Sequence, residues 1–210
     1  MTANTKHKIL NSALELFNRD GIVNVRLQHI ADIAIISVGN LAYHYTNKEG
    51  IVMAIYDELT KKQNNLLAEF RIVPLFDSFD RLLTATFALQ SDYIFFYLDT
   101  LEIIRAYPSI GAKHQQHIAN HISQLRTIID FNVARGALVK EPMEGVYYAL
   151  AQQIWMTIDL RMTQQLIMED RSVIEENYKN SIWNLLIPSF TEMGKQEYLQ
   201  MLQHPYDFYF

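Results

Sequence analysis

The stretch from Arg26 to Lys48, RLQHIADIAIISVGNLAYHYTNK, constrains the fold more than any other part of the sequence. In its first half, apolar residues recur at intervals of three and four, as on one face of a helix: Leu27, Ile30, Ala31 and Ala34. Ser37 can cap a second helix, from about residue 38 to 45, because its hydroxyl can accept a backbone N–H of the following turn. Two short helices joined by a tight turn predict a helix-turn-helix.

The second of these helices is too short to be stable alone in water. The helices before and after it can support it, since their inward positions are apolar: Ile9, Ala13, Leu16, Phe17, Ile51, Ile55 and Leu59. Held in this way, the short helix presents its other face outward, as the recognition helix of a helix-turn-helix does. That outward face carries Val38, Asn40, Tyr43 and His44.

Three segments together form a specific pattern: KILNSALELFNRDG at 8–21, IAD at 30–32 and SVGNLAYHYTNKE at 37–49. Residues 6–56 thereby resemble the DNA-binding domain of the TetR/AcrR family of bacterial transcriptional regulators, a resemblance that covers about a quarter of the chain by motif. It implies an all-α protein, with an N-terminal three-helix domain that binds operator DNA. It also implies a C-terminal helical bundle that binds a small effector and forms a homodimer.

Within this resemblance, we expect a row of residues to face DNA. Arg26 and Lys48 are candidates for phosphate, which positions a domain without reading sequence. Gly39 allows close approach of the backbone, either to DNA or to the neighbouring helix. The complete set of predicted DNA-binding residues is Arg26, Ser37, Val38, Gly39, Asn40, Tyr43, His44 and Lys48.

The sequence departs from the family pattern at three positions. Ile35 stands where the family usually has glycine, in a turn that favours a left-handed backbone. Ala42 stands where the family usually has a tyrosine that contacts phosphate. Arg26 stands where Ser or Thr usually caps the first helix of the motif, although Asn24 is close enough in sequence to take over the cap.

Charge supports the DNA interpretation only weakly. The 210 residues carry a formal net charge of −5, and half of them are hydrophobic. Residues 1–62 contain seven basic and six acidic side chains, so this part is close to neutral. A strongly basic domain would have been direct evidence for nucleic acid. The prediction of DNA binding therefore rests on the motif.

The absence of cysteine excludes disulfides, thiolate metal sites and cysteine catalysis. The N-terminus lacks an apolar signal region, and no apolar run approaches the length of a membrane span. We therefore expect a cytoplasmic protein without a membrane segment.

Helical periodicity continues to the end of the chain. Helices are predicted at about 6–19, 48–70, 75–90, 92–107, 109–135, 144–168, 172–190 and 194–203. Gly21 and Gly136 stand where helices end, as left-handed C-caps. We place the domain boundary along the helix at 48–70. Residues 1–50 form the helix-turn-helix domain, and 51–210 form the effector-binding and dimerisation domain.

The second domain is rich in aromatic residues and methionine. Core packing explains most of them, but such residues also line apolar pockets that have a few polar side chains. The helix at 144–168 is otherwise apolar, and Gln152 and Asp159 on it are candidates for these polar groups. The predicted site for a largely apolar effector comprises Phe96, Asp99, His121, Gln152, Trp155 and Asp159.

Other chemistry has weaker support. His114, His117 and His121 lie on neighbouring faces of one helix and could share a metal. Solvated or hydrogen-bonded histidines explain the same spacing, and we predict neither metal nor cofactor. Asp99 and Glu102 with Arg105 read as pairing along a helix, and no motif of nucleophilic or phosphate-cradling catalysis occurs. Two alternatives to a repressor remain, a dimeric ligand-binding or interaction module without DNA binding and an all-α metal-dependent enzyme.

The helices at 144–168 and 172–190 carry more apolar surface than a helix with one buried side needs. We expect the surplus to pair with the same surface of a second copy about a two-fold axis. The alternative is that the C-terminal tail HPYDFYF covers it and leaves a monomer.

Overall fold

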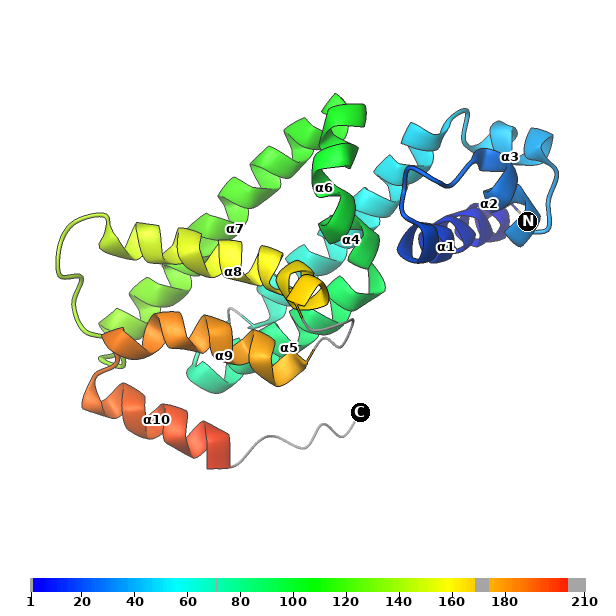
Figure 1. Ribbon diagram of the computed structural model, residues 1–210. Coiled ribbons are helices and arrows are strands. Elements are labelled where there is room, and N and C mark those ends of the chain that lie inside the picture. Colours follow the sequence, from blue (N-terminus) through cyan, green and yellow to red (C-terminus); the bar gives the residue numbers. More distant parts are fainter. Residues whose placement is uncertain (1, 71, 169–173, 204–210) are drawn as a thin grey trace. The chain divides into compact units, whose positions relative to one another are not determined.

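The computed structural model describes residues 2–70, 72–168 and 174–203, and these residues are almost entirely helical (Figure 1). The helices are α1 (Thr2–Asp20), α2 (Leu27–Ile33), α3 (Val38–His44), α4 (Lys48–Phe70), α5 (Phe76–Asp92), α6 (Ile94–Ala106), α7 (Pro108–Ala134), α8 (Val146–Met168), α9 (Glu175–Leu186), the 3-10 turn η1 (Ile187–Ser189) and α10 (Glu192–Gln203). Within these ranges the only extended pairing is an isolated bridge between Leu138 and Phe190. The predicted all-α fold is confirmed.

Most helix ends lie within two residues of their predicted positions, because glycine and proline mark them. Gly21 and Gly136 have φ values of +76° and +84°, as expected of left-handed C-caps. Helix α1 begins at Thr2, four residues before its predicted start, and the largest difference at a C-terminal end is that of the helix predicted at 172–190. It changes to a 3-10 turn at Ile187, since Pro188 has no N–H for the α-helical ladder. Its predicted start at Ser172 and the tail at 204–210 lie outside the described residues.

The chain forms two compact units, and each is described by itself. Unit 1 comprises residues 1–63 and 89–116, and unit 2 comprises 64–88 and 117–210. The chain therefore passes between the units within α4, α5 and α7. The predicted division into 1–50 and 51–210 is a division by function, and it stays a prediction.

Unit 1 combines the helix-turn-helix with α6. Its core contains the apolar positions predicted to support the short helix, and Ile9, Ala13, Phe17 and Ile51 are completely buried. Asn18 of α1 joins the start of α6, since its Oδ1 accepts the Phe95 N–H at 3.2 Å and its Nδ2 donates to the Asp92 carbonyl at 2.8 Å. These two bonds satisfy backbone groups at a helix junction.

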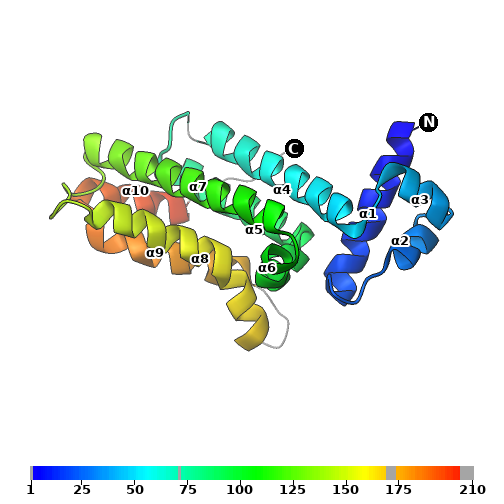
Figure 2. The ribbon, with the colours of Figure 1, turned by 90° about the horizontal axis from the view of Figure 1, so that it is seen from above.

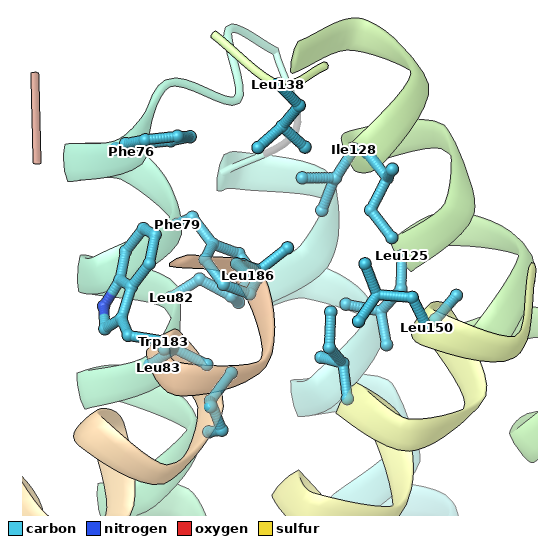
Figure 3. Close-up of a cluster of buried hydrophobic side chains, with 14 of the residues drawn as sticks. Phe76, Phe79, Leu82, Leu83, Leu125, Ile128, Leu138, Leu150, Trp183 and Leu186 are labelled. Carbon is cyan, nitrogen blue, oxygen red and sulfur yellow. The ribbon is translucent and has the colours of Figure 1, made fainter. Parts of the chain in front are cut away.

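Unit 2 is built around an aromatic and aliphatic core from α5, α7, α8 and α9. Figure 3 shows part of this cluster, with Phe76, Phe79 and Trp183 on one side and Leu125, Ile128 and Leu150 on the other. The Phe76 ring stacks on Phe190 with centroids 4.8 Å apart and meets Trp183 edge-on at 5.2 Å. In both ribbon views, α8 and α9 lie side by side (Figures 1 and 2).

The last helix, α10, is fixed to unit 2 by close backbone packing and by charge. A Cβ atom at Gly194 would overlap the carbonyl oxygen of Ala137, so only glycine fits there. Arg135 pairs with Glu197 through two hydrogen bonds of 2.6 and 2.9 Å. Glu197 also accepts the backbone N–H of Phe76, at the start of α5, at 3.0 Å. Helix α10 is therefore an integral part of unit 2.

Candidate nucleic-acid interface

The short helix α3 is held in unit 1 by its one buried side chain, Leu41. Ser37 caps it as predicted, since its Oγ accepts the Asn40 N–H at 3.1 Å. The capped helix follows a tight turn after α2, whose Ile30 and Ala31 are buried. Two short helices with this connection form the predicted helix-turn-helix.

The turn between α2 and α3 contains Ile35 in a left-handed conformation, with φ +55°. Its N–H bonds to the Asp32 carbonyl at 3.1 Å, and the next N–H, of Ile36, bonds to Ala31 at 3.0 Å. A β-branched residue is strained in this region of backbone space. The Ile35 side chain is also 81% exposed, so burial does not compensate for the strain.

The outer face of α3 is open to solvent. Val38, Gly39 and Asn40 are exposed, Tyr43 is 81% exposed, and His44 is partly buried against the edge of the Tyr43 ring, with centroids 5.2 Å apart. A Cβ atom at Gly39 would meet only Ser37 Oγ, at 3.9 Å. Close approach to a neighbouring helix therefore does not explain this glycine.

Arg26 precedes α2, and its side chain is exposed. Its backbone N–H donates to Nδ1 of His29 at 3.3 Å, which satisfies one group at the start of the helix. The predicted cap by Asn24 is wrong, because Arg26 itself occupies the N-cap position of α2. Asn24 Nδ2 instead donates to the Asp20 carbonyl, at the end of α1, at 2.8 Å.

Lys48 lies differently from the prediction that it faces a phosphate. Its ammonium donates to the Ile22 carbonyl and lies 5.7 Å from the centroid of the Phe17 ring. Burial lowers the pKa of this lysine. The same residue is also held through its N–H, which donates to the Asp99 carboxylate at 2.8 Å. An exposed cation close to the end of α3 is instead Lys6, whose ammonium is 6.0 Å from the centroid of the Tyr45 ring.

The predicted effector residues are divided between the two units, with Phe96 and Asp99 in unit 1. Phe96 is buried, and its ring is 5.1 Å from Tyr56 and 5.2 Å from His114. Asp99 binds the Ile22 peptide, so its predicted pairing with Arg105 is not formed, whereas Glu102 and Arg105 pair at 3.9 Å. Both residues therefore have structural contacts inside unit 1.

The other four, His121, Gln152, Trp155 and Asp159, belong to unit 2. The His121 ring contacts the His117 ring in a tilted arrangement, with centroids 4.0 Å apart, and Trp155 packs against the core. Gln152 is exposed on α8, and Asp159 is partly buried. Burial raises the pKa of Asp159 to about 6, and no hydrogen bond or ion pair to its carboxylate occurs within the described residues.

A groove of about 530 Å³ in unit 2 is lined by residues that the sequence did not single out. Asp80 accepts the Trp183 indole N–H at 2.9 Å and pairs with Lys179, while Glu175 accepts the Thr84 hydroxyl at 2.6 Å. Ninety-nine positions separate Asp80 from Lys179. No local pattern could therefore have indicated this network.

Two other features bear on function. No group of three or more potential metal ligands occurs in the part of the chain that the structure describes. His114 is buried, and its Nδ1 lies 3.3 Å from the Tyr56 hydroxyl, which fits the hydrogen-bonded reading of that histidine. None of the helices in the described ranges has the length and hydrophobicity that crossing a membrane requires.

Two family models match the chain. One, described as bacterial regulatory proteins of the tetR family, matches residues 9–55, and the other, described as a bacterial transcriptional repressor and named TetR, matches residues 55–198. The chain belongs to the TetR family. The match to the second model covers more than half of the chain and includes most of unit 2, so TetR-family membership extends beyond the helix-turn-helix.

Individual TetR-family proteins are similar to parts or all of this chain. The HTH-type transcriptional regulator UidR of Escherichia coli K12 is 34% identical over 67 residues, which are 32% of this chain and 33% of that protein. The chain thus matches about a third of the length of this curated relative.

Among solved structures, a TetR-family regulator from Marinobacter aquaeolei VT8 has a TM-score of 0.83 at 24% identity, over 95% of this chain and 98% of the other. The fatty acid degradation regulator FadR of Bacillus halodurans has a TM-score of 0.69 at 14% identity, over 87% and 94% of the two chains. These likenesses establish the fold.

Proposed function

We propose that this TetR-family protein binds operator DNA through α3 and represses transcription until a small effector binds. The observation that carries the proposal is the outer face of α3, where a capped helix presents Val38, Asn40 and Tyr43 to solvent. Buried side chains hold the rest of the motif in place. Such a helix fits the major groove with its first residues at the base edges.

Within this proposal, Asn40, Tyr43 and His44 meet bases or phosphate, and Arg26 and Lys6 meet phosphate. Gly39 lets the backbone approach the duplex. Ser37 contributes by capping the helix. Lys48 supports the domain from inside through the Ile22 carbonyl. A regulator of bacterial DNA works in the cytoplasm, and the proposal includes no catalytic activity.

The test is a fluorescence-anisotropy titration of the full-length protein with a duplex from the region upstream of its own gene. Tyr43→Ala should weaken binding by about tenfold, the loss typical of one base-pair contact. Met143→Ala is the matched control, because Met143 is also strongly exposed but lies in unit 2. Absence of binding by the unmodified protein would favour the ligand-binding or interaction module without DNA binding.

We propose further that two copies associate through α8 and α9. The exposed surface of α8 carries Tyr148, Met156, Leu160 and Ile167 at helical spacing, with Gln152 between them. Exposed apolar side chains in a row mark an interaction surface. Two recognition helices must also lie roughly 34–36 Å apart to enter successive major grooves. Light scattering should give a dimer, and Leu160→Asp should give a monomer with unchanged helix content.

The effector site belongs to unit 2 in this proposal. Trp155 offers an aromatic wall, and Asp159 offers a carboxylate that has no donor among the described residues. His121 on α7 and Gln152 on α8 are the other expected members of the site, and both belong to the same unit. A largely apolar effector with one hydrogen-bond donor matches these groups. Quenching of tryptophan fluorescence by a candidate effector, lost in Asp159→Ala, would support the assignment.

A further inference from the structure

The first turn of α3 begins with an apolar side chain at the surface. Val38 is the first residue of the helix and is 36% exposed. The hydroxyl of Ser37 is engaged by the Asn40 N–H, and Gly39 has no side chain. The start of the helix therefore offers a partner one branched aliphatic group, with open space beside it, before the first polar side chain at Asn40.

Val38 lies on the same helix as the residues of the proposed DNA interface, so we expect the partner of its side chain to be a base of the DNA. In the major groove, thymine is the base that presents a methyl group, at C5, whereas the recognition groups of the other bases are hydrogen-bond donors and acceptors. An aliphatic side chain placed against the amino group of cytosine or adenine would leave that donor without a partner, which is unfavourable.

We propose that Val38 contacts the C5-methyl of a thymine in each half-site, so that the operator requires thymine at that position. The inference rests on the proposed DNA-binding function, and it adds the base that one residue selects. Gly39 provides the room, because a Cβ atom there would meet nothing but Ser37 Oγ, at 3.9 Å, and the groove edge can occupy that space.

The experiment first selects an operator from a random duplex pool with the full-length protein. Each thymine of the selected duplex is then replaced by deoxyuridine, which removes only the methyl group. One thymine per half-site should be sensitive, with affinity falling about fourfold for each methyl, the value for burial of one such group. Replacement in both half-sites together should lower the affinity roughly fifteenfold.

Val38→Ala should bind the thymine and uracil duplexes equally well at the sensitive position. Val23→Ala is the matched control, since Val23 is 70% exposed in the same unit but lies outside α2 and α3, and it should keep the full sensitivity. The replacement of thymine by deoxyuridine uses the unmodified protein, so this part of the test remains informative even if Val38→Ala folds poorly.

Two results would overturn the proposal. Either no thymine is sensitive to loss of its methyl, or Val38→Ala remains as sensitive as the unmodified protein. A selection that enriches no sequence at all would instead contradict the proposed sequence-specific DNA binding, and the thymine contact with it. Failure of the thymine contact alone and failure of the DNA-binding function therefore give different results.

Discussion

The α2–α3 surface of unit 1 and the packing of α10 in unit 2 differ in how well their residue types suit the local geometry. Around α10, the residues are those that the local geometry needs, with glycine at 194 where a Cβ would overlap a carbonyl and Glu197 in contact with Arg135 and the Phe76 N–H. Around α3, isoleucine occupies a left-handed turn at 35, and glycine occupies an unobstructed helical position at 39. Because local choices agree with the fold except where function intervenes, the difference supports the proposal that a partner determines the α3 surface.

The first prediction tests the unit 2 side of this comparison. Gly194→Ala should lower the free energy of unfolding by about 3 kcal/mol, because the new Cβ overlaps the Ala137 carbonyl and the backbone must shift. Denaturant unfolding followed by circular dichroism measures the loss. Unchanged stability would show that α10 is not packed as tightly as described.

Unit 2 also contains one residue that does not suit its surroundings, Asp159, whose carboxylate is partly buried. Its folded-state pKa of about 6 lies above the ordinary 3.8, so protonation favours the folded state. The stability contributed by the protonated carboxyl is complete below pH 3.8 and is lost as the pH rises through 6. Asp159→Asn should therefore stabilise the protein by about 1–2 kcal/mol at pH 8 and by little at pH 3.5.

Unfolding titrations at those two pH values measure the effect. Equal effects of Asp159→Asn at both pH values would show that folding does not raise the pKa of Asp159. Asp130→Asn is not a neutral control, since Asp130 pairs with Arg126. Glu176→Gln is suitable, because Glu176 is exposed on α9.

The helices and the motif could be predicted from the sequence because their signals are local. Apolar spacing and the glycine and proline boundaries determined the helices, and the cap at Ser37 followed from residue type. The left-handed turn at Ile35 followed from the resemblance to the family, since isoleucine itself disfavours that conformation. The inward position of Lys48 could not be predicted, since it depends on a carbonyl 26 residues away. The junction of Asn18 with α6 spans 77 residues and likewise leaves no local pattern.

The strain at Ile35 gives the third prediction. Ile35→Gly should raise the free energy of unfolding by up to about 1 kcal/mol, because glycine adopts φ +55° without the steric penalty of a β-branched residue. Ile35→Ala keeps a Cβ and should gain less. Thermal unfolding of the three proteins measures the order, and a clear loss of stability in Ile35→Gly would mean that the side chain stabilises the fold.

The fourth prediction, which has the smallest expected effect, concerns the salt dependence of DNA binding. It distinguishes the exposed basic side chains of unit 1 from Lys48, which binds a carbonyl of the same unit. Lys6→Ala and Arg26→Ala should each flatten the slope of log affinity against log salt by about 0.9, the value for one phosphate contact. Lys48→Ala should leave the slope unchanged and lower stability, since its ammonium binds the Ile22 carbonyl. A flatter slope in Lys48→Ala would restore the phosphate role expected from the sequence.

The most direct test of the central claim measures stability and DNA affinity together in Gly39→Ala. Alanine should stabilise α3 by up to about 1 kcal/mol, because glycine is unfavourable inside a helix and the position is open. The same methyl group should lower operator affinity by about tenfold, since it occupies the space that the duplex needs. A variant that is more stable and binds DNA as well as the unmodified protein would contradict the claim that DNA determines the surface of α3.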